Sequence, residues 1–407
     1  MKCRSCHSDN LKSFIDLGYS PPSNAYIEKD SLIEPEITYP LRVVLCSDCW
    51  LVQTEDYAVA EEIFNENYAY FSSTSSSWLD HASKYVDMII NKLKLSKNSF
   101  VVEIASNDGY LLKNFLSNGI DCIGFEPTSS TANAAKELGI KVEEVFFEAE
   151  TARKLAAYKK ADLIIGNNVF AHVPDVLSFA EGMELLLNDE GTITLEFHHL
   201  LNLITLHQFD TIYHEHYSYY SLLSINLLLK SKGLRIYDVE QLETHGGSLR
   251  VYACNENASI QTNNNSINKI VALEEAAKLN ELSGYAHYQT QVDNIKNNLI
   301  KFLIDAKEQN KVVAGYGAAA KGNTFLNYAG IKPDLIPYIV DNAPSKQGKF
   351  TPGGHIPIVD SEYLYKQKPD YILILPWNLA EEIADQNVKA RSFNCKFVTA
   401  IPEIKVF

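Results

Sequence analysis

The stretch SFVVEIASNDGYLLKNFL, residues 99–116, decides the fold. Its first half is an apolar run interrupted only by Glu103, which predicts a buried strand, and its second half has the spacing of an amphipathic helix. In the turn between them, Gly109 and the small Ala105 and Ser106 would let the backbone approach a ligand. The stretch predicts the opening strand-turn-helix unit of a doubly wound α/β sheet.

The pattern of a strand with a polar tip recurs twice. DCIGFEPTSSTANAAKEL (121–138) predicts a strand ending at Glu126 and then a helix, and ADLIIGNNVFAHVPD (161–175) predicts a strand ending at Asn167 and Asn168. Ligands of such sheets lie outside the carboxyl ends of the strands, and an acid at the second tip holds a ribose diol. The expected cofactor-binding residues are Glu103, Ser106, Asp108, Gly109, Glu126 and Asn168.

The first turn lacks G-x-G-x-x-G, which disfavours a dinucleotide. S-adenosylmethionine has no pyrophosphate to bind and fits this turn better. The alternative is an ordinary α/β core with incidental acidic residues.

Two C-x-x-C pairs occupy the N-terminal segment. Cys3 and Cys6 form one pair, Cys46 and Cys49 form the other, and the remaining three cysteines stand alone. Two such knuckles predict a closed, structural zinc site that stabilises a domain too small for a core of its own. A redox C-x-x-C motif is the alternative.

The stretch KVVAGYGAAAKGNTFLNYAG, residues 311–330, predicts a second strand-turn-helix unit. Its glycines satisfy the relaxed dinucleotide pattern, and Asp341 ends the next strand, which together favour NAD. Lys321 and Asn323 at the start of the helix favour instead the pyrophosphate of a nucleotide sugar. The residues leave both interpretations open. Residues 267–310 have helical periodicity and should bridge the two units.

Composition and charge exclude several classes of function. The chain has 407 residues, is 46% hydrophobic and carries a formal net charge of -15, which argues against a nucleic-acid or anionic-membrane surface. Its apolar runs are far shorter than the roughly 20 residues of a membrane span, and MKCRSCHSDN at the N-terminus lacks the apolar core of a signal peptide. We expect a cytoplasmic protein with neither a nucleic-acid nor a membrane partner.

The stretch TIYHEHYSYYS, residues 211–221, fits no hydrophobic period of helix or strand. Four hydrogen-bonding or ionisable side chains stand in a row, followed by three tyrosines. This indicates either a proton-transfer site or an exposed polar loop.

Six motifs occur in one order: the two knuckles, EIASNDGYLL, NNVFAHVPD, YHEHYSYYS, THGGSLR (244–250) and GYGAAAKGNTFLNYAGI. Together they resemble the S-adenosylmethionine-dependent sugar C-methyltransferases, typified by the C-3 methyltransferases of deoxysugar biosynthesis. The resemblance covers nearly the whole chain. It implies a zinc-binding domain (1–70), a central Rossmann-like class I methyltransferase domain (71–240) and a C-terminal Rossmann-like domain (241–407) that binds a nucleotide sugar.

The resemblance also implies a substrate and its site. The substrate would be a nucleotide-linked 4-keto-6-deoxysugar methylated at C3, with its diphosphate facing Gly317, Lys321 and Asn323. The family's histidine–tyrosine site falls on His172, Tyr213, Glu215 and His216, and Tyr68 or Tyr70 would touch sugar or cofactor.

Methylation at C3 requires removal of a proton next to the 4-keto group, for which imidazole is suited near neutral pH. We expect His216 to be the base, Tyr213 and His172 to orient the sugar or stabilise the enolate, and Glu215 to hold a sugar hydroxyl or tune a histidine. In a strand, Tyr213 and Glu215 would face away from His216, so the segment should bend. The rival hypotheses are an NAD-dependent sugar-nucleotide oxidoreductase and a catalytically silent zinc-ribbon binding module.

Overall fold

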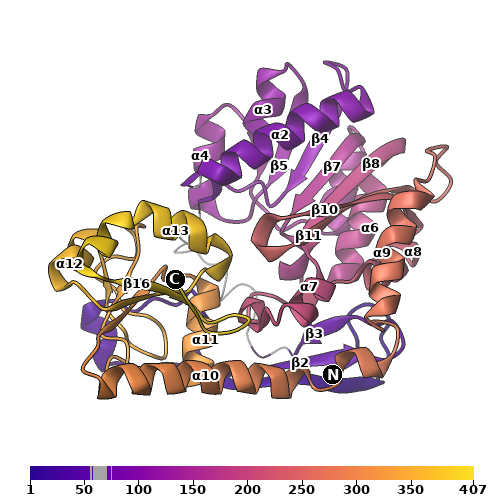
Figure 1. Ribbon diagram of the computed structural model, residues 1–407. Coiled ribbons are helices and arrows are strands. Elements are labelled where there is room, and N and C mark those ends of the chain that lie inside the picture. Colours follow the sequence, from indigo (N-terminus) through magenta and orange to yellow (C-terminus); the bar gives the residue numbers. More distant parts are fainter. Residues whose placement is uncertain (56, 58–70, 75) are drawn as a thin grey trace.

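Three β-sheets follow one another along the chain in the computed structural model, which describes residues 1–55, 57, 71–74 and 76–407 (Figure 1). The first sheet is small and antiparallel, and the other two are mainly parallel with helices against them. This confirms the predicted α/β fold, with a small cysteine-rich N-terminal domain and two Rossmann-like parts.

The N-terminal sheet takes its last strand from a distant part of the chain. Its four strands, in sheet order, are β1 (Leu11–Ser20), β2 (Tyr39–Cys46), β3 (Val52–Thr54) and β9 (Ser218–Tyr219). The strand β9 belongs to the YHEHYSYYS segment and pairs antiparallel with β3. The expected active-site segment is therefore built into the cysteine-rich domain.

The central sheet has seven strands in the order β10-β11-β8-β7-β4-β5-β6. Its strands are β4 (Phe100–Ile104), β5 (Asp121–Phe125), β6 (Lys141–Glu143), β7 (Ala161–Asn167), β8 (Leu187–His198), β10 (Leu234–Leu242) and β11 (Ser248–Asn255). Strands β4 to β8 run parallel to one another, and β11 is antiparallel to both of its neighbours, β8 and β10. The strand order reverses at β4, which lies between β5 and β7, and ligands of such sheets bind at the carboxyl ends of the strands beside a reversal of this kind.

Helices cover both faces of the central sheet (Figure 1). They are α2 (Ser76–Leu93), α3 (Leu112–Ser117), α4 (Ser129–Glu137), α5 (Ala149–Ala156), α6 (Val176–Leu186), α8 (Leu222–Lys230) and α9 (Asn264–Ala276). Helix α7 (Leu200–Thr205) packs instead into the core shared with the two smaller domains. The buried faces of α2 and α3 share one core, and those of α6 and α8 share another. The expected domain boundary at residue 240 lies within β10, because β10 and β11 complete the central sheet.

The C-terminal domain is a six-stranded sheet in the order β14-β13-β12-β15-β16-β17. Its elements are α10 (Tyr288–Glu308), β12 (Val313–Tyr316), α11 (Ala320–Ala329), β13 (Ile339–Val340), β14 (Ile358–Val359), α12 (Ser361–Gln367), β15 (Tyr371–Ile374), α13 (Ala380–Gln386), β16 (Lys396–Thr399) and β17 (Lys405–Val406). The helical region predicted between the units is present as α9 and α10, separated by the 3-10 helix η6 (Leu282–Tyr285). Helix α10 contacts both β1 and α11, so it bridges the two smaller domains.

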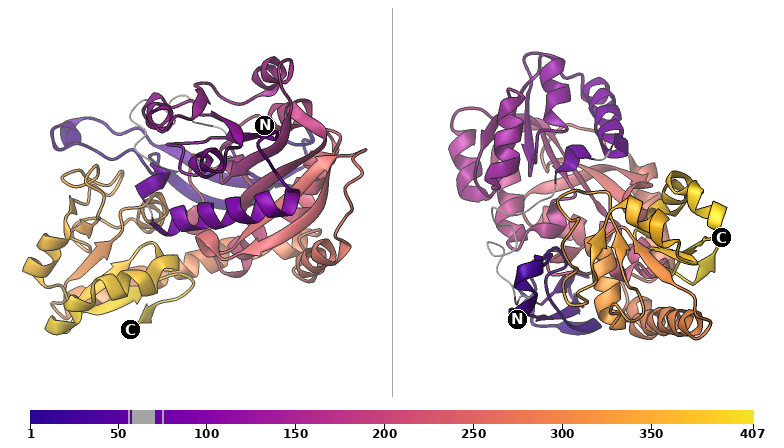
Figure 2. Two further views of the ribbon diagram at one scale, coloured as in Figure 1. Left: turned by 90° about the horizontal axis from the view of Figure 1, so that it is seen from above. Right: turned by 90° about the vertical axis from the view of Figure 1, so that its left-hand side faces the viewer.

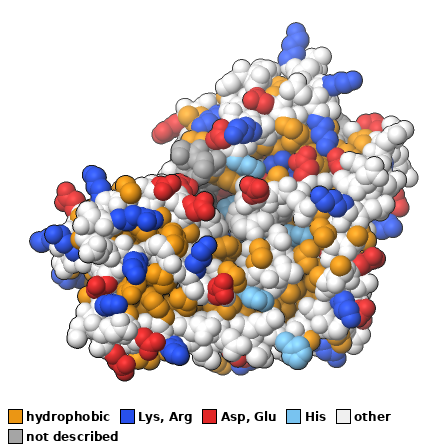
Figure 3. Space-filling view, viewed as in Figure 1, with side chains coloured by type: hydrophobic (Ala, Val, Ile, Leu, Met, Phe, Trp, Pro, Cys, Tyr) orange, Lys and Arg blue, Asp and Glu red, His pale blue; other side chains and the backbone are white. Residues whose placement is uncertain are grey.

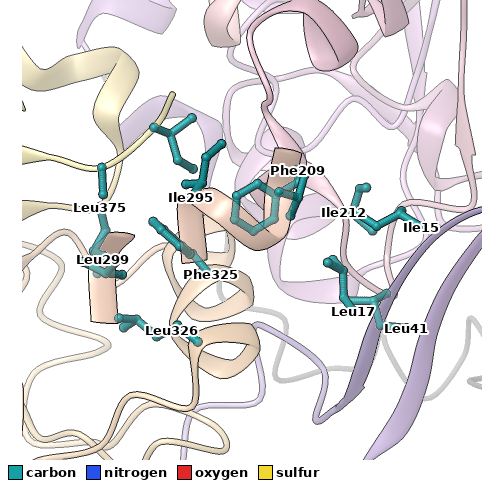
Figure 4. Close-up of a cluster of buried hydrophobic side chains, with 14 of the residues drawn as sticks. Ile15, Leu17, Leu41, Phe209, Ile212, Ile295, Leu299, Phe325, Leu326 and Leu375 are labelled. Atoms are coloured by element: carbon teal, nitrogen blue, oxygen red, sulfur yellow. The ribbon is translucent and has the colours of Figure 1, made fainter. Parts of the chain in front are cut away.

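One apolar core joins the three domains. Figure 2 shows the N-terminal sheet and the C-terminal domain side by side beneath the central domain. Phe209, in the 3-10 helix η4 (Phe209–Thr211), is fully buried and meets Phe325 of α11 edge to face, with ring centroids 5.1 Å apart (Figure 4). Ile212 lies beside Ile15 of β1 in the same cluster. The segment that precedes YHEHYSYYS is thus clamped between the other two domains.

No helix in the described ranges has the length and apolar character needed to cross a bilayer.

Candidate active site

Two turns of the same shape bring the four predicted metal ligands together. In each C-x-x-C pair, the N–H after the second cysteine donates to the carbonyl of the first, His7 to Cys3 and Trp50 to Cys46, both at 2.9 Å. His7 and Trp50 both adopt left-handed backbone conformations, with φ values of 60° and 61°. The four sulfur atoms, of Cys3, Cys6, Cys46 and Cys49, lie within 4.8 Å of one another.

This donor set fits a structural zinc ion. Four thiols form a closed tetrahedral set, and among the described residues the group includes no histidine or carboxylate. The side-chain amide of Gln53 donates to the sulfur of Cys3 at 3.3 Å, the kind of outer contact that orients a metal ligand. Zinc would therefore stabilise the N-terminal sheet and leave no position for a substrate.

The turn after β4 has an unusual backbone conformation and is held by hydrogen bonds from residues 72 and 73. Ala105, Asn107 and Gly109 have positive φ values of 56°, 49° and 76°. The side chains of Asn107 and Asp108 accept hydrogen bonds from the backbone N–H groups of residues 72 and 73, at 2.9 and 3.0 Å. These residues belong to the 3-10 helix η2 (Ser72–Thr74), which therefore lies against the turn.

Buried polar atoms surround the carboxyl ends of β4 and β7. Within the described part of the chain, six such atoms have no hydrogen-bond partner: Oε2 of Glu103, Oγ of Ser106, Oδ1 of Asp108, Oδ1 and Nδ2 of Asn167, and Nδ2 of Asn168. Buried polar groups are normally satisfied, so these atoms indicate a polar ligand. Their mixture of donors and acceptors fits the amino-acid and ribose groups of S-adenosylmethionine.

Glu103 and Glu126 differ in the hydrogen bonds that the protein itself donates to their carboxylates. Burial raises the pKa of Glu103 well above its ordinary value, and the charges of Asp108 and Glu126 raise it further. Glu126 accepts backbone N–H groups from Asn107 and Thr128 at 3.0 and 2.9 Å, which partly offset the rise in pKa that its burial causes. Because each carboxylate oxygen accepts two hydrogen bonds, Glu126 retains capacity for a ribose diol.

The structure adds a packing constraint at Gly109 to the role expected of it. A Cβ atom at Gly109 would lie 2.4 Å from Cδ1 of Ile140, so packing against protein also favours a glycine here. Gly124 of β5 was missed in the sequence. A Cβ atom there would lie 2.1 Å from Oγ of Ser106, so this glycine makes room for the cofactor-site serine.

A second buried ionic cluster lies at the end of β8. The carboxylate of Glu196 accepts hydrogen bonds from Arg250 at 2.9 Å and Thr244 at 3.0 Å, and lies 3.1 Å from Nε2 of His81. Burial alone would raise the pKa of Glu196, but the hydrogen bond with His81 and the charge of Arg250 outweigh burial and lower it. The cluster ties the THGGSLR turn to α2. A single acid inside the apolar strand TITLEFH was the available signal in the sequence.

The predicted proton-transfer segment turns sharply, as expected. The N–H of His216 donates to the carbonyl of Tyr213 at 2.9 Å, and regular strand begins only at Ser218. The Nδ1 atom of His216 lies 2.7 Å from the carbonyl oxygen of Thr211, and its Nε2 atom lies 2.8 Å from the hydroxyl of Tyr213. A carbonyl can only accept, so Nδ1 carries the proton and Nε2 accepts from the phenol. The Thr211 carbonyl could not be foreseen because a backbone acceptor leaves no sequence signal.

His172 completes the pair of imidazoles. It lies in the 3-10 helix η3 (Phe170–His172), and its ring meets that of His216 edge to face with centroids 4.6 Å apart. Burial lowers the pKa of His172 to about 4, and burial together with the neighbouring His172 lowers that of His216 well below its ordinary value. Both rings are therefore neutral at pH 7, which a proton acceptor requires.

The two residues between Tyr213 and His216 contact the N-terminal domain. His214 lies against the N-terminal sheet, with Nε2 3.3 Å from the carbonyl of Pro40. Glu215 is only 2% exposed, and its Oε1 atom accepts a hydrogen bond from the side-chain amide of Asn24 at 2.6 Å. A loop of the N-terminal domain thus reaches the predicted catalytic segment.

The C-terminal domain brings Lys321 to the same junction. Its Nζ atom lies 3.4 Å from the carbonyl of His245 in the THGGSLR turn, and burial lowers its pKa while the charge of Asp210 partly offsets that effect. Asp210, beside Thr211, accepts the indole N–H of Trp377 at 2.8 Å. Lys321 therefore places a positive charge at the junction of the central and C-terminal domains.

The other two predicted substrate residues contact protein. Asn323 donates to the carbonyl of Ser23 at 2.8 Å, and its Oδ1 atom is buried without a partner in the described part of the chain. A Cβ atom on Gly317 would lie 2.5 Å from Cδ of Pro376, so this glycine is required by packing. Tyr68 and Tyr70 lie outside the described residues.

The NAD interpretation of residues 311–341 depends on Asp341, which also contacts protein. The carboxylate of Asp341, which would have to hold a ribose, accepts the backbone N–H groups of Ala318 and Ala343, each at 2.8 Å. Lys346 lies 3.7 Å from the same carboxylate. Asp341 therefore braces the glycine turn.

Figure 3 shows histidine side chains where the central domain meets the two smaller ones. The candidate site is thus a junction, with cofactor-type groups from the central sheet, the Tyr213–His216 pair from the segment that enters the N-terminal sheet, and Lys321 from the C-terminal domain.

Comparison with known proteins assigns each part of the chain. Residues 3–64 match the family described as "Putative zinc binding domain", residues 78–239 match "Methyltransferase domain", and residues 243–402 match "C-methyltransferase C-terminal domain". The C-methyltransferase NovU of Streptomyces niveus is 32% identical over 406 residues, covering 100% of this chain and 96% of that protein.

Two solved methyltransferases resemble part of the chain. A SAM-dependent methyltransferase from Anabaena variabilis covers 49% of this chain and 96% of its own, at a TM-score of 0.40 and 14% identity. The magnesium protoporphyrin IX methyltransferase of Synechocystis, solved with bound SAH, covers 44% of this chain and 83% of its own, at a TM-score of 0.36 and 14% identity.

Proposed function

The chain belongs to the S-adenosylmethionine-dependent C-methyltransferase family with an N-terminal zinc-binding domain, and we propose that it methylates C3 of a nucleotide-linked 4-keto-6-deoxysugar. The observation that carries this proposal is the hydrogen-bonded pair of Tyr213 and His216. It lies beside His172, at the junction of the three domains.

The proposed reaction needs a carbon nucleophile. S-adenosylmethionine, when bound, supplies an electrophilic methyl group on a sulfonium. The protein must then remove the proton from C3 of the sugar, which the adjacent ketone acidifies, and direct the resulting enolate carbon to that methyl. Glu103, Ser106, Asp108, Glu126 and Asn168 would hold the cofactor; Glu103, Ser106, Asp108 and Asn168 each carry a buried polar atom without a partner in the described part of the chain.

His216 is the proposed base. The carbonyl of Thr211 holds the Nδ1 proton at 2.7 Å, so the lone pair on Nε2 is the acceptor site. When Nε2 takes the C3 proton, the same carbonyl stabilises the imidazolium, as the orienting group does in a catalytic triad. Tyr213, which donates to Nε2 in the protein alone, would turn its hydroxyl to the sugar when substrate displaces that contact.

The developing negative charge on the ketone oxygen needs a donor. Burial lowers the pKa of His172 to about 4, so the ring is neutral, and its single N–H would have to turn from the backbone of Glu215 to serve an oxyanion. One well-placed donor of this kind contributes roughly 3–4 kcal/mol to such a transition state. His172 and Tyr213 are the candidates.

Lys321 is proposed to meet the substrate's diphosphate. It stands at the N-terminus of α11, where the helix dipole and a lysine together favour a phosphate. Asn323, with its unpaired Oδ1 atom, would accept a donor from the nucleotide or sugar.

The decisive experiment incubates the protein with S-adenosylmethionine and a panel of 4-keto-6-deoxy nucleotide sugars in deuterated buffer. We expect a product heavier by one methyl group, with the new carbon located at C3 by NMR, and exchange of the C3 hydrogen for deuterium. If no sugar is alkylated or exchanged, the proposed substrate class is wrong. Methylation at another carbon would refute C3.

A further inference from the structure

The loop after β1, with the sequence PPSNAY at 21–26, lies between the catalytic segment and the C-terminal domain. Three contacts anchor it to α11 and the turn before that helix. Asn323 donates to the carbonyl of Ser23 at 2.8 Å, the hydroxyls of Ser23 and Thr324 lie 3.1 Å apart, and the hydroxyl of Tyr26 donates to the carbonyl of Ala318 at 2.5 Å. These contacts fix the position of Asn24 from both sides.

The side chain of Asn24 is directed to the catalytic segment instead. Its Nδ2 atom lies 2.6 Å from Oε1 of Glu215, a residue 191 positions later in the chain. The nitrogen of the Asn24 amide must face Glu215, because the amide oxygen and the carboxylate are both acceptors and could not form a hydrogen bond with each other. A hydrogen bond this short to a carboxylate is of the charge-assisted kind and is roughly twice as strong as a neutral one.

Glu215 needs such a partner because it is buried. Only 2% of its surface is exposed, and a carboxylate removed from water is costly unless donors surround it. Glu215 directly precedes His216, the proposed base. The hydrogen bond from Asn24 therefore helps to set where a carboxylate stands next to that base.

We propose that Asn24 of the N-terminal domain is a positioning residue, which orients Glu215 toward the sugar and thereby makes the zinc-binding domain part of the active site. The inference deepens the proposed function and rests on it. It also gives the N-terminal domain a role beyond folding, because Asn24 acts on a residue of another domain.

A purely structural role for the loop is the competing explanation. In that case Asn24 would matter only because it helps to hold the loop on α11, and its loss would act independently of Glu215. Ser23 offers the matched control, since it lies in the same loop and bonds to Thr324 and Asn323 but has no recorded bond to Glu215.

The test is a double-mutant cycle on the full-length, zinc-loaded protein. We expect Asn24→Ala to lower kcat about 10-fold with KM changed less than 3-fold, and to have less than a 2-fold effect when Glu215 is already alanine. Ser23→Ala should have the same effect in both backgrounds. Binding of S-adenosylmethionine, followed by calorimetry, should be unchanged in every variant.

The outcomes separate the two claims. Equal effects of Asn24→Ala with and without Glu215 would overturn the positioning role, as would a change confined to KM. If the wild-type protein alkylates no sugar of the panel, the proposed function fails. The same cycle read on the free energy of unfolding then decides whether Asn24 and Glu215 are coupled, and additivity would refute the inference.

Discussion

Replacing His216 by asparagine tests the proposed base with little disturbance of its surroundings. Asparagine can keep the donor that faces the carbonyl of Thr211, which now receives the Nδ1 proton at 2.7 Å. What it lacks is the Nε2 acceptor, 2.8 Å from the hydroxyl of Tyr213. The substitution thus removes the proton-accepting atom and leaves the backbone contact in place.

The expected loss follows from the chemistry removed. A positioned general base contributes roughly 10²- to 10⁴-fold to a rate, so we expect kcat to fall by about 10³-fold, equivalent to about 4 kcal/mol in the barrier. Affinity for S-adenosylmethionine should stay within about threefold, because the cofactor groups stand on β4, β5 and β7.

The neighbouring His214 provides the control. It belongs to the same segment and is buried, but it faces the carbonyl of Pro40 in the N-terminal sheet. We expect His214→Asn to keep kcat within about threefold. Methyl transfer and deuterium exchange at C3 are measured for both variants. Exchange at the wild-type rate in His216→Asn would refute the base assignment.

The acid limb of the wild-type kcat/KM profile gives an independent check. Burial lowers the pKa of His216, so the ring stays neutral, and active, below its ordinary pKa of about 6.5. The value of kcat/KM should therefore begin to fall only below about pH 6.5. A limb above pH 6.5 would contradict the assignment.

Three further predictions concern the other parts of the site. Glu103→Gln should weaken S-adenosylmethionine binding about 10-fold in calorimetry. It should leave the melting temperature of the cofactor-free protein equal or higher, because the folded-state pKa of Glu103 is raised and such a carboxyl costs stability as the pH rises through that pKa. Cys46→Ser should release zinc, measured by metal analysis, and lower the free energy of unfolding by roughly 4 kcal/mol; retained metal would contradict the knuckle. Lys321→Ala should raise KM for the nucleotide sugar at least about 10-fold with S-adenosylmethionine affinity unchanged, while Lys349→Ala, a surface control paired with Glu28, should not.

The parts of the site that lie within one local unit could be predicted from the sequence. The strand 100–104 and its turn appear as predicted because a continuous apolar run and a glycine turn are local signals. The four cysteines meet because each knuckle is a self-contained turn. The bend at residues 213–216 followed from the impossibility of placing Tyr213 and His216 on one face of a strand.

Contacts between domains could not be predicted in this way. Nothing in the sequence pairs Asn24 with Glu215, because they stand 191 residues apart and neither belongs to a periodic pattern. The packing constraints on Gly109 and Gly317 were also not foreseen. Both lie in turns that resemble ligand-binding turns, yet the atoms that exclude a side chain are Ile140 and Pro376, whose proximity depends on tertiary packing.

A chain of contacts leads from the metal site to the base. Arg4, between the first two cysteines, donates to the carbonyls of Thr54 at 2.8 Å and Tyr217 at 3.2 Å. The hydroxyl of Thr54 donates in turn to the carbonyl of His216 at 3.2 Å, and β3 pairs with β9 directly after that histidine.

The position of His216 therefore depends indirectly on the cysteine knuckle, through Arg4 and Thr54, although no cysteine is proposed to take part in the reaction. A zinc ion that only raised stability would leave kcat per folded molecule unchanged when it was lost. The path through Arg4 and Thr54 requires instead that kcat of the molecules still folded falls with the metal. Activity normalised to the folded fraction, measured by circular dichroism during slow chelation, distinguishes the two cases.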